Sequence, residues 1–105
     1  MDKSLENIIN STIDKITEVL VPIKIILFGS AITNNFNIDS DIDFLVVVKN
    51  GTNKRKLTQK IYKNILSIGF ATDIVLIDED EFDEFKNFDG YAIKSIVETG
   101  QVIYG

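Results

Sequence analysis

Two aspartates, Asp41 and Asp43, are separated by one residue at the start of an apolar segment, a spacing suited to binding a metal ion. Alternate side chains of an extended strand point to the same face, so the two carboxylates lie roughly 6–7 Å apart at their Cβ atoms. Hard cations such as Mg²⁺ prefer carboxylate oxygens, and a bound cation relieves the repulsion between the two charges. The alternative is a pair of solvated carboxylates at a strand edge, with Asp39 as a third, because isolated pairs of this kind are common.

A glycine and a serine, Gly29 and Ser30, end the apolar segment that precedes these aspartates. Glycine lets the backbone approach a phosphate closely, and the following amide and the serine hydroxyl can donate hydrogen bonds to its oxygens. A turn that holds phosphate and a carboxylate pair that holds a metal are the two halves of a site for phosphoryl transfer. The alternative is an ordinary turn that ends a strand.

A third aspartate, Asp73, is the only charged residue between positions 64 and 77. A carboxylate among apolar neighbours is costly to desolvate unless it faces a site or a partner. If its strand pairs with the strand of Asp43, Asp73 faces the same cation, and it can accept the proton of an attacking hydroxyl or hold a second metal ion. The alternative is a carboxylate at the entry of a strand, still partly in water.

The spacing of apolar residues predicts the elements that must position these side chains. The predicted elements are helices over residues 5–20, 52–69 and 80–98 (the last as one or two helices), strands over residues 23–28, 42–48, 72–77 and 101–104, and a polar loop over residues 31–40 that starts with a helical turn. This order predicts one domain over residues 1–105 of the α/β (α+β) class. Its small mixed β-sheet has about four strands, with helices packed against it.

The composition excludes several other kinds of chemistry. The chain has no cysteine and no histidine, so disulfides, thiolate sites and imidazole bases are excluded, and catalysis must use carboxylates, a metal or hydroxyls. The absence of cysteine fits a cytoplasmic location. A net charge of −5 argues against direct binding to nucleic acid. The longest apolar run, residues 19–28, is too short to span a membrane.

Taken together, these motifs resemble the DNA polymerase β-type nucleotidyltransferase superfamily and, within it, the minimal nucleotidyltransferases. The resemblance covers essentially the whole chain and is carried by Gly-Ser, ten residues, Asp-x-Asp and a later lone Asp, in the segments LFGS, SDIDFLVVV, ATDIVLID and SIVETGQVIYG. It implies a palm-like nucleotidyltransferase fold in which Gly29 and Ser30 bind the nucleoside triphosphate. Asp41, Asp43 and Asp73 would be the catalytic residues and would bind two Mg²⁺ ions. The implied reaction transfers a nucleoside monophosphate, commonly AMP from ATP, to a hydroxyl and releases pyrophosphate.

The same resemblance implies a partner protein. Minimal nucleotidyltransferases often act beside a HEPN-domain toxin, so the chain is expected to be the antitoxin that adenylylates a tyrosine of that toxin. Many small members carry G-S-R-A-R-G, whereas residues 31–34 here read Ala-Ile-Thr-Asn and lack the arginines that supply positive charge near the triphosphate. Two alternatives stay open: a binding module with little or no activity that neutralises a HEPN partner by contact, and an enzyme acting on a small molecule such as an aminoglycoside. A homo-oligomer is also left open.

Overall fold

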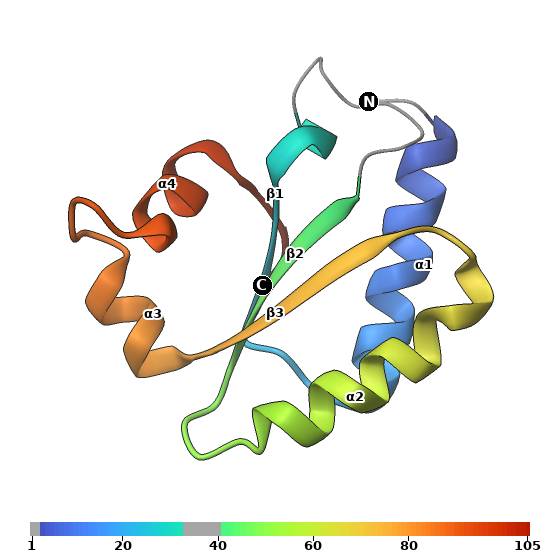
Figure 1. The fold of residues 1–105 in the computed structure, drawn as a ribbon, viewed down its shortest axis with the longest axis horizontal. Coiled ribbons are helices and arrows are strands. Elements are labelled where there is room, and N and C mark those ends of the chain that lie inside the picture. Colours follow the sequence, from blue (N-terminus) through green and yellow to red (C-terminus); the bar gives the residue numbers. More distant parts are fainter. Residues whose placement is uncertain (1–2, 33–40) are drawn as a thin grey trace.

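The computed structural model describes residues 3–32 and 41–105, and a four-stranded mixed sheet lies at its centre (Figure 1). The strands are β1 (Lys24–Phe28), β2 (Ile42–Val48), β3 (Thr72–Asp78) and β4 (Gln101–Tyr104), in the order β3-β2-β1-β4. β1 is antiparallel to both β2 and β4, whereas β2 and β3 are parallel. The predicted α/β class with about four strands in a mixed sheet is therefore confirmed.

Helices pack on both faces of this sheet (Figure 1). One face is covered by α1 (Lys3–Val19) and α2 (Lys54–Ile65), and the other by α3 (Glu79–Phe85) and α4 (Ala92–Thr99). The parallel pairing of β2 and β3 requires a crossover between them, and α2 provides it. No helix within the described ranges is long and apolar enough to cross a membrane.

The strand β2 contributes to both hydrophobic cores, which explains why its sequence is almost continuously apolar. Successive side chains of a strand point to opposite faces, so Phe44 and Val46 pack toward α1 and α2, and Leu45 and Val47 pack toward α3 and α4. The buried members of the first core on the helices and strands include Ile9, Ile16, Leu27, Phe44, Val46 and Ile61, and the second core contains Ile26, Leu45, Val47, Ile77 and Phe82.

The connecting segments agree with the predicted turns where the structure describes them. The predicted loop over residues 31–40 begins with a short 3₁₀ helix, η1 (Gly29–Ile32), and its remainder lies outside the described residues. A second 3₁₀ turn, η2 (Leu66–Ile68), extends α2 and ends at Gly69, which adopts the left-handed conformation (φ 73°) that favours glycine. The segment predicted over residues 80–98 forms two helices, α3 and α4.

Candidate active site

The topology brings the end of β1 and the starts of β2 and β3 to one end of the sheet. Because β2 and β3 are parallel, their first residues lie side by side, and Asp43 pairs with Asp73 in register. Because β1 is antiparallel to β2, its last residue, Phe28, pairs with Asp43 from the other side. Paired residues of neighbouring strands share a face. The side chains of Phe28, Asp43 and Asp73 therefore lie on the same face, which is the face that α3 and α4 partly cover.

Gly29 is in direct contact with the Asp43 carboxylate. Its backbone has φ +79°, a left-handed conformation, and a Cβ atom built at this position would collide with Asp43 Oδ2. The left-handed backbone therefore favours glycine, and a side chain at this position would also force the Asp43 carboxylate to move. Ser30 follows in the first turn of η1 and is partly buried. The structure thus places Gly29, the first residue of the predicted phosphate turn, beside Asp43, the predicted metal ligand.

The electrostatics of the site centre on Asp43. Burial raises the pKa of this half-buried carboxyl group above its ordinary value of 3.8. The negative charges of Asp73 and Asp41 and a side-chain hydrogen bond with Asp73 raise the pKa further. Asp43 is therefore within electrostatic reach of both Asp41 and Asp73, and their repulsion of its ionised form is a feature of the fold.

These carboxylates fit a divalent metal, although they do not form a complete cage. Within residues 3–32 and 41–105, no group of three acidic side chains lies close enough together to hold a metal ion. Asp41 is exposed and precedes the first residue of β2, so the closest association is between Asp43 and Asp73. Mg²⁺ is commonly bound by one or two carboxylates together with substrate phosphates and water. Two paired carboxylates, one of them held in a repulsive environment that a cation would relieve, are a suitable donor set for such an ion.

The basic start of α2 lies away from this end of the sheet. Lys54, at the start of α2, has its Nζ atom 2.7 Å from Asp78 Oδ2, at the opposite end of β3 from Asp73. Ala31, the residue directly after Gly29 and Ser30, is 5% exposed and packs into the core. Residues 33 and 34 lie outside the described ranges.

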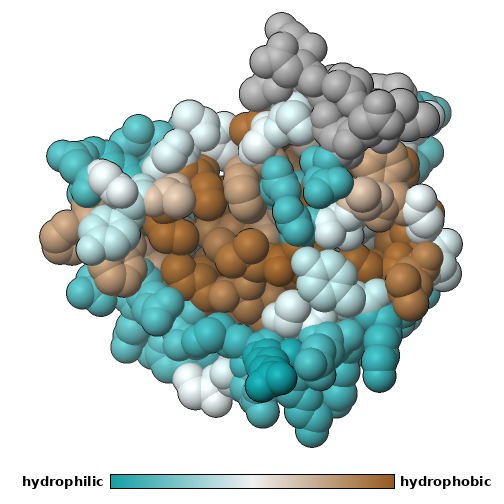
Figure 2. Space-filling view, viewed as in Figure 1, coloured by the Kyte–Doolittle hydropathy of each residue, from teal (hydrophilic) through white to brown (hydrophobic). Residues whose placement is uncertain are grey.

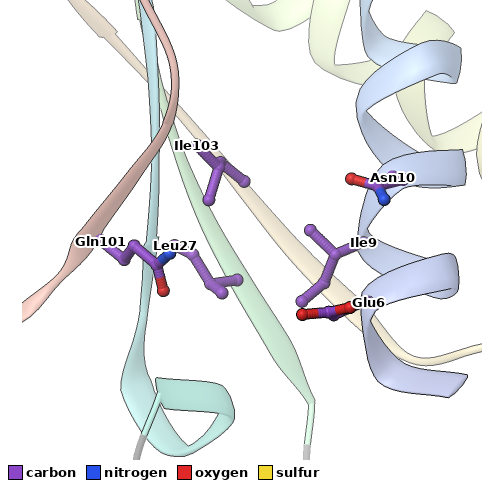
Figure 3. Close-up of a pocket in the computed structure, with 6 residues that line it drawn as sticks. All are labelled: Glu6, Ile9, Asn10, Leu27, Gln101 and Ile103. Atoms are coloured by element: carbon purple, nitrogen blue, oxygen red, sulfur yellow. The ribbon is translucent and has the colours of Figure 1, made fainter. Parts of the chain in front are cut away.

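A hollow of about 270 Å³ between α1 and the strands β1 and β4 is separate from the carboxylates (Figure 3). Glu6 and Asn10 of α1 and Gln101 of β4 line it above an apolar floor. Leu27 belongs to that floor and pairs with Phe44, so the hollow lies on the opposite face of the sheet from Asp43. It therefore contains none of the predicted site residues.

One residue beside the site was missed by the sequence analysis. The hydroxyl of Tyr62, on α2, accepts a hydrogen bond of 2.9 Å from the backbone N–H of Ile74, the residue after Asp73. Its helical position indicates only which face of α2 it occupies. Its contact with β3 depends on the order of the strands in the sheet, and the spacing of apolar residues does not predict that order.

The comparison with known families agrees with this geometry. A model of the nucleotidyltransferase domain family matches residues 7–103, nearly the whole chain, including Gly29, Ser30 and the three aspartates. The chain therefore belongs to the nucleotidyltransferase domain family, and the resemblance to minimal nucleotidyltransferases is confirmed. It is a transferase of the nucleotidyl kind with a nucleoside triphosphate as substrate. No curated protein and no solved structure matches the chain.

Proposed function

We propose that the chain transfers AMP from ATP, or another nucleoside monophosphate from its triphosphate, to a tyrosine hydroxyl of a HEPN-domain partner, and that this modification makes it the antitoxin of a toxin–antitoxin pair. The observation that carries the proposal is the pairing of Asp43 with Asp73 in register, with Gly29 against the Asp43 carboxylate. This arrangement supports the proposal because it brings Gly29, Asp43 and Asp73 to one end of the sheet.

In this proposal the residues of the chain have separate roles. The backbone at Gly29 and Ser30 binds the triphosphate, and the absence of a side chain at Gly29 lets it come close to Asp43. The acceptor oxygen attacks the α-phosphorus, the bond from that phosphorus to the bridging oxygen breaks, and pyrophosphate leaves. Asp73 takes the proton of the acceptor hydroxyl. Asp41 and Asp43 provide carboxylate oxygens that would bind the metal ion.

Mg²⁺ bound at these carboxylates would neutralise the phosphate charge and align the attacking and leaving oxygens. The need for Mg²⁺ follows from the negative charge of the site. A triphosphate brought to three uncompensated aspartates would be repelled, and the chain offers no arginine at Ala31 to offset that repulsion.

Exposed apolar side chains near the site support a protein acceptor. Val75 lies two residues after Asp73, on the same face of β3, and is 47% exposed. Hydrophobic side chains gather across the middle of the face seen in Figure 2, between α2 and the pair of α3 and α4. A polycationic acceptor such as an aminoglycoside gains little from such a surface, whereas a protein can bury it.

The test uses α-³²P-labelled ATP, Mg²⁺ and the helical protein encoded beside this chain, with Asp43→Asn as the inactive variant. Asp14→Asn is the matched control, because it makes the same charge change at an exposed position on α1. Label should appear on the partner with the wild type and with Asp14→Asn, and should fall at least a hundredfold with Asp43→Asn. Equal labelling by the two variants would contradict the proposal.

A second candidate function is favoured by the buried Ala31 in place of an arginine. In this alternative the chain binds the HEPN partner and neutralises it without transferring a nucleotide. The same experiment separates the two candidates if the activity of the partner is measured in parallel. Neutralisation by Asp43→Asn as complete as that by the wild type, without label in either, would support the binding module.

A further inference from the structure

The strand that carries Asp73 lies at the edge of the sheet. Among the strands of residues 3–32 and 41–105, β3 pairs only with β2 in the order β3-β2-β1-β4, so its outer edge presents backbone groups that none of these strands satisfies. At this edge, the Ile74 N–H donates to the Tyr62 hydroxyl, 2.9 Å away and partly buried. The peptide unit that joins Asp73 to Ile74 is planar, so a hydrogen bond at the Ile74 nitrogen fixes the plane attached to the Asp73 Cα atom. The direction of the Asp73 side chain depends on that plane.

The helix α2 holds β3 at two points, one near each end of the strand. Tyr62, toward the end of α2, binds the start of β3, and Lys54, at the beginning of α2, binds Asp78 at the end of β3. The two contacts link the same helix to the same strand, and only the Tyr62 contact lies beside Asp73. Lys54 therefore serves as an internal control for the loss of a connection between α2 and β3.

We propose that Tyr62 is a positioning residue of the transfer site, because its hydroxyl fixes the Asp73–Ile74 peptide and thereby keeps the Asp73 carboxylate beside Asp43. This inference rests on the role proposed for Asp73. The pairing with β2 holds β3 from its inner side, and the backbone of Ile42 donates to Ala71 O at 3.0 Å just before β3 begins. Tyr62 holds the outer side. Without its hydroxyl, the Ile74 N–H loses this partner, and the exposed Asp73 next to it is less restrained.

A purely structural role for Tyr62 makes a different prediction. If the hydroxyl served only to hold α2 against the sheet, then removing the Tyr62 contact or the Lys54 contact would affect the site similarly. If it positions Asp73, then only its own removal affects the chemical step. The binding of the triphosphate depends in this proposal on Gly29 and Ser30, which both lie in η1 rather than on α2, so it should be preserved.

The experiment compares Tyr62→Phe with Lys54→Met and with Tyr91→Phe, which removes the hydroxyl of an exposed tyrosine on a different element. The first measurement is kinetic, with kcat and KM for ATP determined well below the melting temperature of each variant. The second is independent of catalysis: Mn²⁺ is titrated into ¹⁵N-labelled protein, and the paramagnetic broadening of the Asp73 and Asp43 amide signals is followed.

For Tyr62→Phe we expect kcat to fall about tenfold, with KM for ATP changed less than twofold. The Mn²⁺ concentration that half-broadens the Asp73 signal should rise several-fold, while that for Asp43 stays near the wild-type value. Lys54→Met and Tyr91→Phe should behave as the wild type in both measurements. Unchanged broadening of Asp73 in Tyr62→Phe, or equal effects of Lys54→Met, would overturn the inference. If the wild type transfers no nucleotide, the proposed function fails, and the Mn²⁺ titration alone decides whether Tyr62 positions Asp73.

Discussion

The contact between Gly29 and the Asp43 carboxylate is the tightest constraint on the site at the scale of single residues. Gly29 has a left-handed backbone and no room for a Cβ atom, while Gly51 has nearly the same backbone (φ +83°) with no heavy atom within 4 Å of such a Cβ. The two glycines therefore separate the cost of the backbone from the cost of the collision.

We predict that Gly29→Ala and Gly51→Ala each lose about 1–2 kcal/mol of stability from the left-handed backbone. Gly29→Ala should lose more than Gly51→Ala, because its methyl group displaces Asp43. Nucleotidyl transfer should fall at least tenfold in Gly29→Ala and stay near the wild-type rate in Gly51→Ala. Urea denaturation and the labelled-ATP assay measure the two effects. Equal transfer rates in the two variants would show that the contact with Asp43 is unimportant for activity.

The raised pKa of Asp43 predicts how stability depends on pH in metal-free protein. Burial, Asp73 and Asp41 make the folded state hold the Asp43 proton more tightly than the unfolded state does. This contribution to stability is fully present below pH 3.8, the ordinary pKa, and is lost as the pH rises through the raised pKa of the folded state. At neutral pH, the ionised Asp43 therefore lowers the stability of the wild type.

Asp43→Asn should accordingly melt a few degrees above the wild type at pH 7 in a chelating buffer, and the difference should shrink as the pH falls toward 3.8. Thermal melts followed by circular dichroism between pH 3 and pH 8 provide the measurement, with Asp14→Asn as control. A lower melting temperature for Asp43→Asn at neutral pH would mean that its carboxylate is stabilised by contacts other than those described above.

At the scale of elements, most of the secondary structure follows from local patterns. The run over residues 42–48 predicts β2 with its bounds because both of its faces are buried, and Gly69 marks the end of η2 because only glycine readily adopts its left-handed backbone. Periodicity assigns a side chain to a face of its own strand. It therefore predicted that Asp41 and Asp43 share a face.

The neighbours of each strand could not be predicted in the same way, because hydrophobic periodicity is a local property and strand order is not. The predicted approach of Asp43 and Asp73 depends on their strands being adjacent, and the structure shows that they are. The position of Tyr62 at the β3 edge depends on the same adjacency. The basic residues at the start of α2 lie at the far end of β3 from Asp73, a placement that requires the crossover direction to be known.

The helix α2 also yields a prediction at this scale. Ile61 is fully buried in the core that α2 forms with α1 and the sheet, whereas Leu66, in the turn that extends the helix, is 76% exposed. Ile61→Ala should lower the free energy of unfolding by about 2–5 kcal/mol, and Leu66→Ala by less than about 0.5 kcal/mol. Chemical denaturation measures both losses, with one m-value (the dependence of the unfolding free energy on denaturant concentration) fitted to all the variants. Similar losses at the two positions would contradict the packing of α2 described above.

For the whole molecule, metal binding and folding should be linked through the site. A ligand that binds only the folded state raises its stability by about 2.7 kcal/mol at a concentration one hundred times its dissociation constant. Mg²⁺ together with a non-hydrolysable ATP analogue should therefore raise the melting temperature of the wild type by several degrees. Differential scanning fluorimetry measures the shift.

The matched variants make this whole-molecule prediction specific. Asp14→Asn should show the full shift, because its position on α1 is exposed and is not one of the site aspartates. Asp43→Asn should show little or none. A shift that survives in Asp43→Asn would place the bound metal and nucleotide elsewhere on the chain.

The in-register pair of Asp43 and Asp73 has a consequence for laboratory evolution. A library of variants selected only for survival of heating in a chelating buffer would enrich neutral replacements at Asp43, because each relieves the repulsion in the folded state. The same library heated with Mg²⁺ and a nucleotide would retain the aspartate. The divergence of the two selected populations at this single position would report, without any assay of catalysis, which ligand this end of the sheet is shaped to receive.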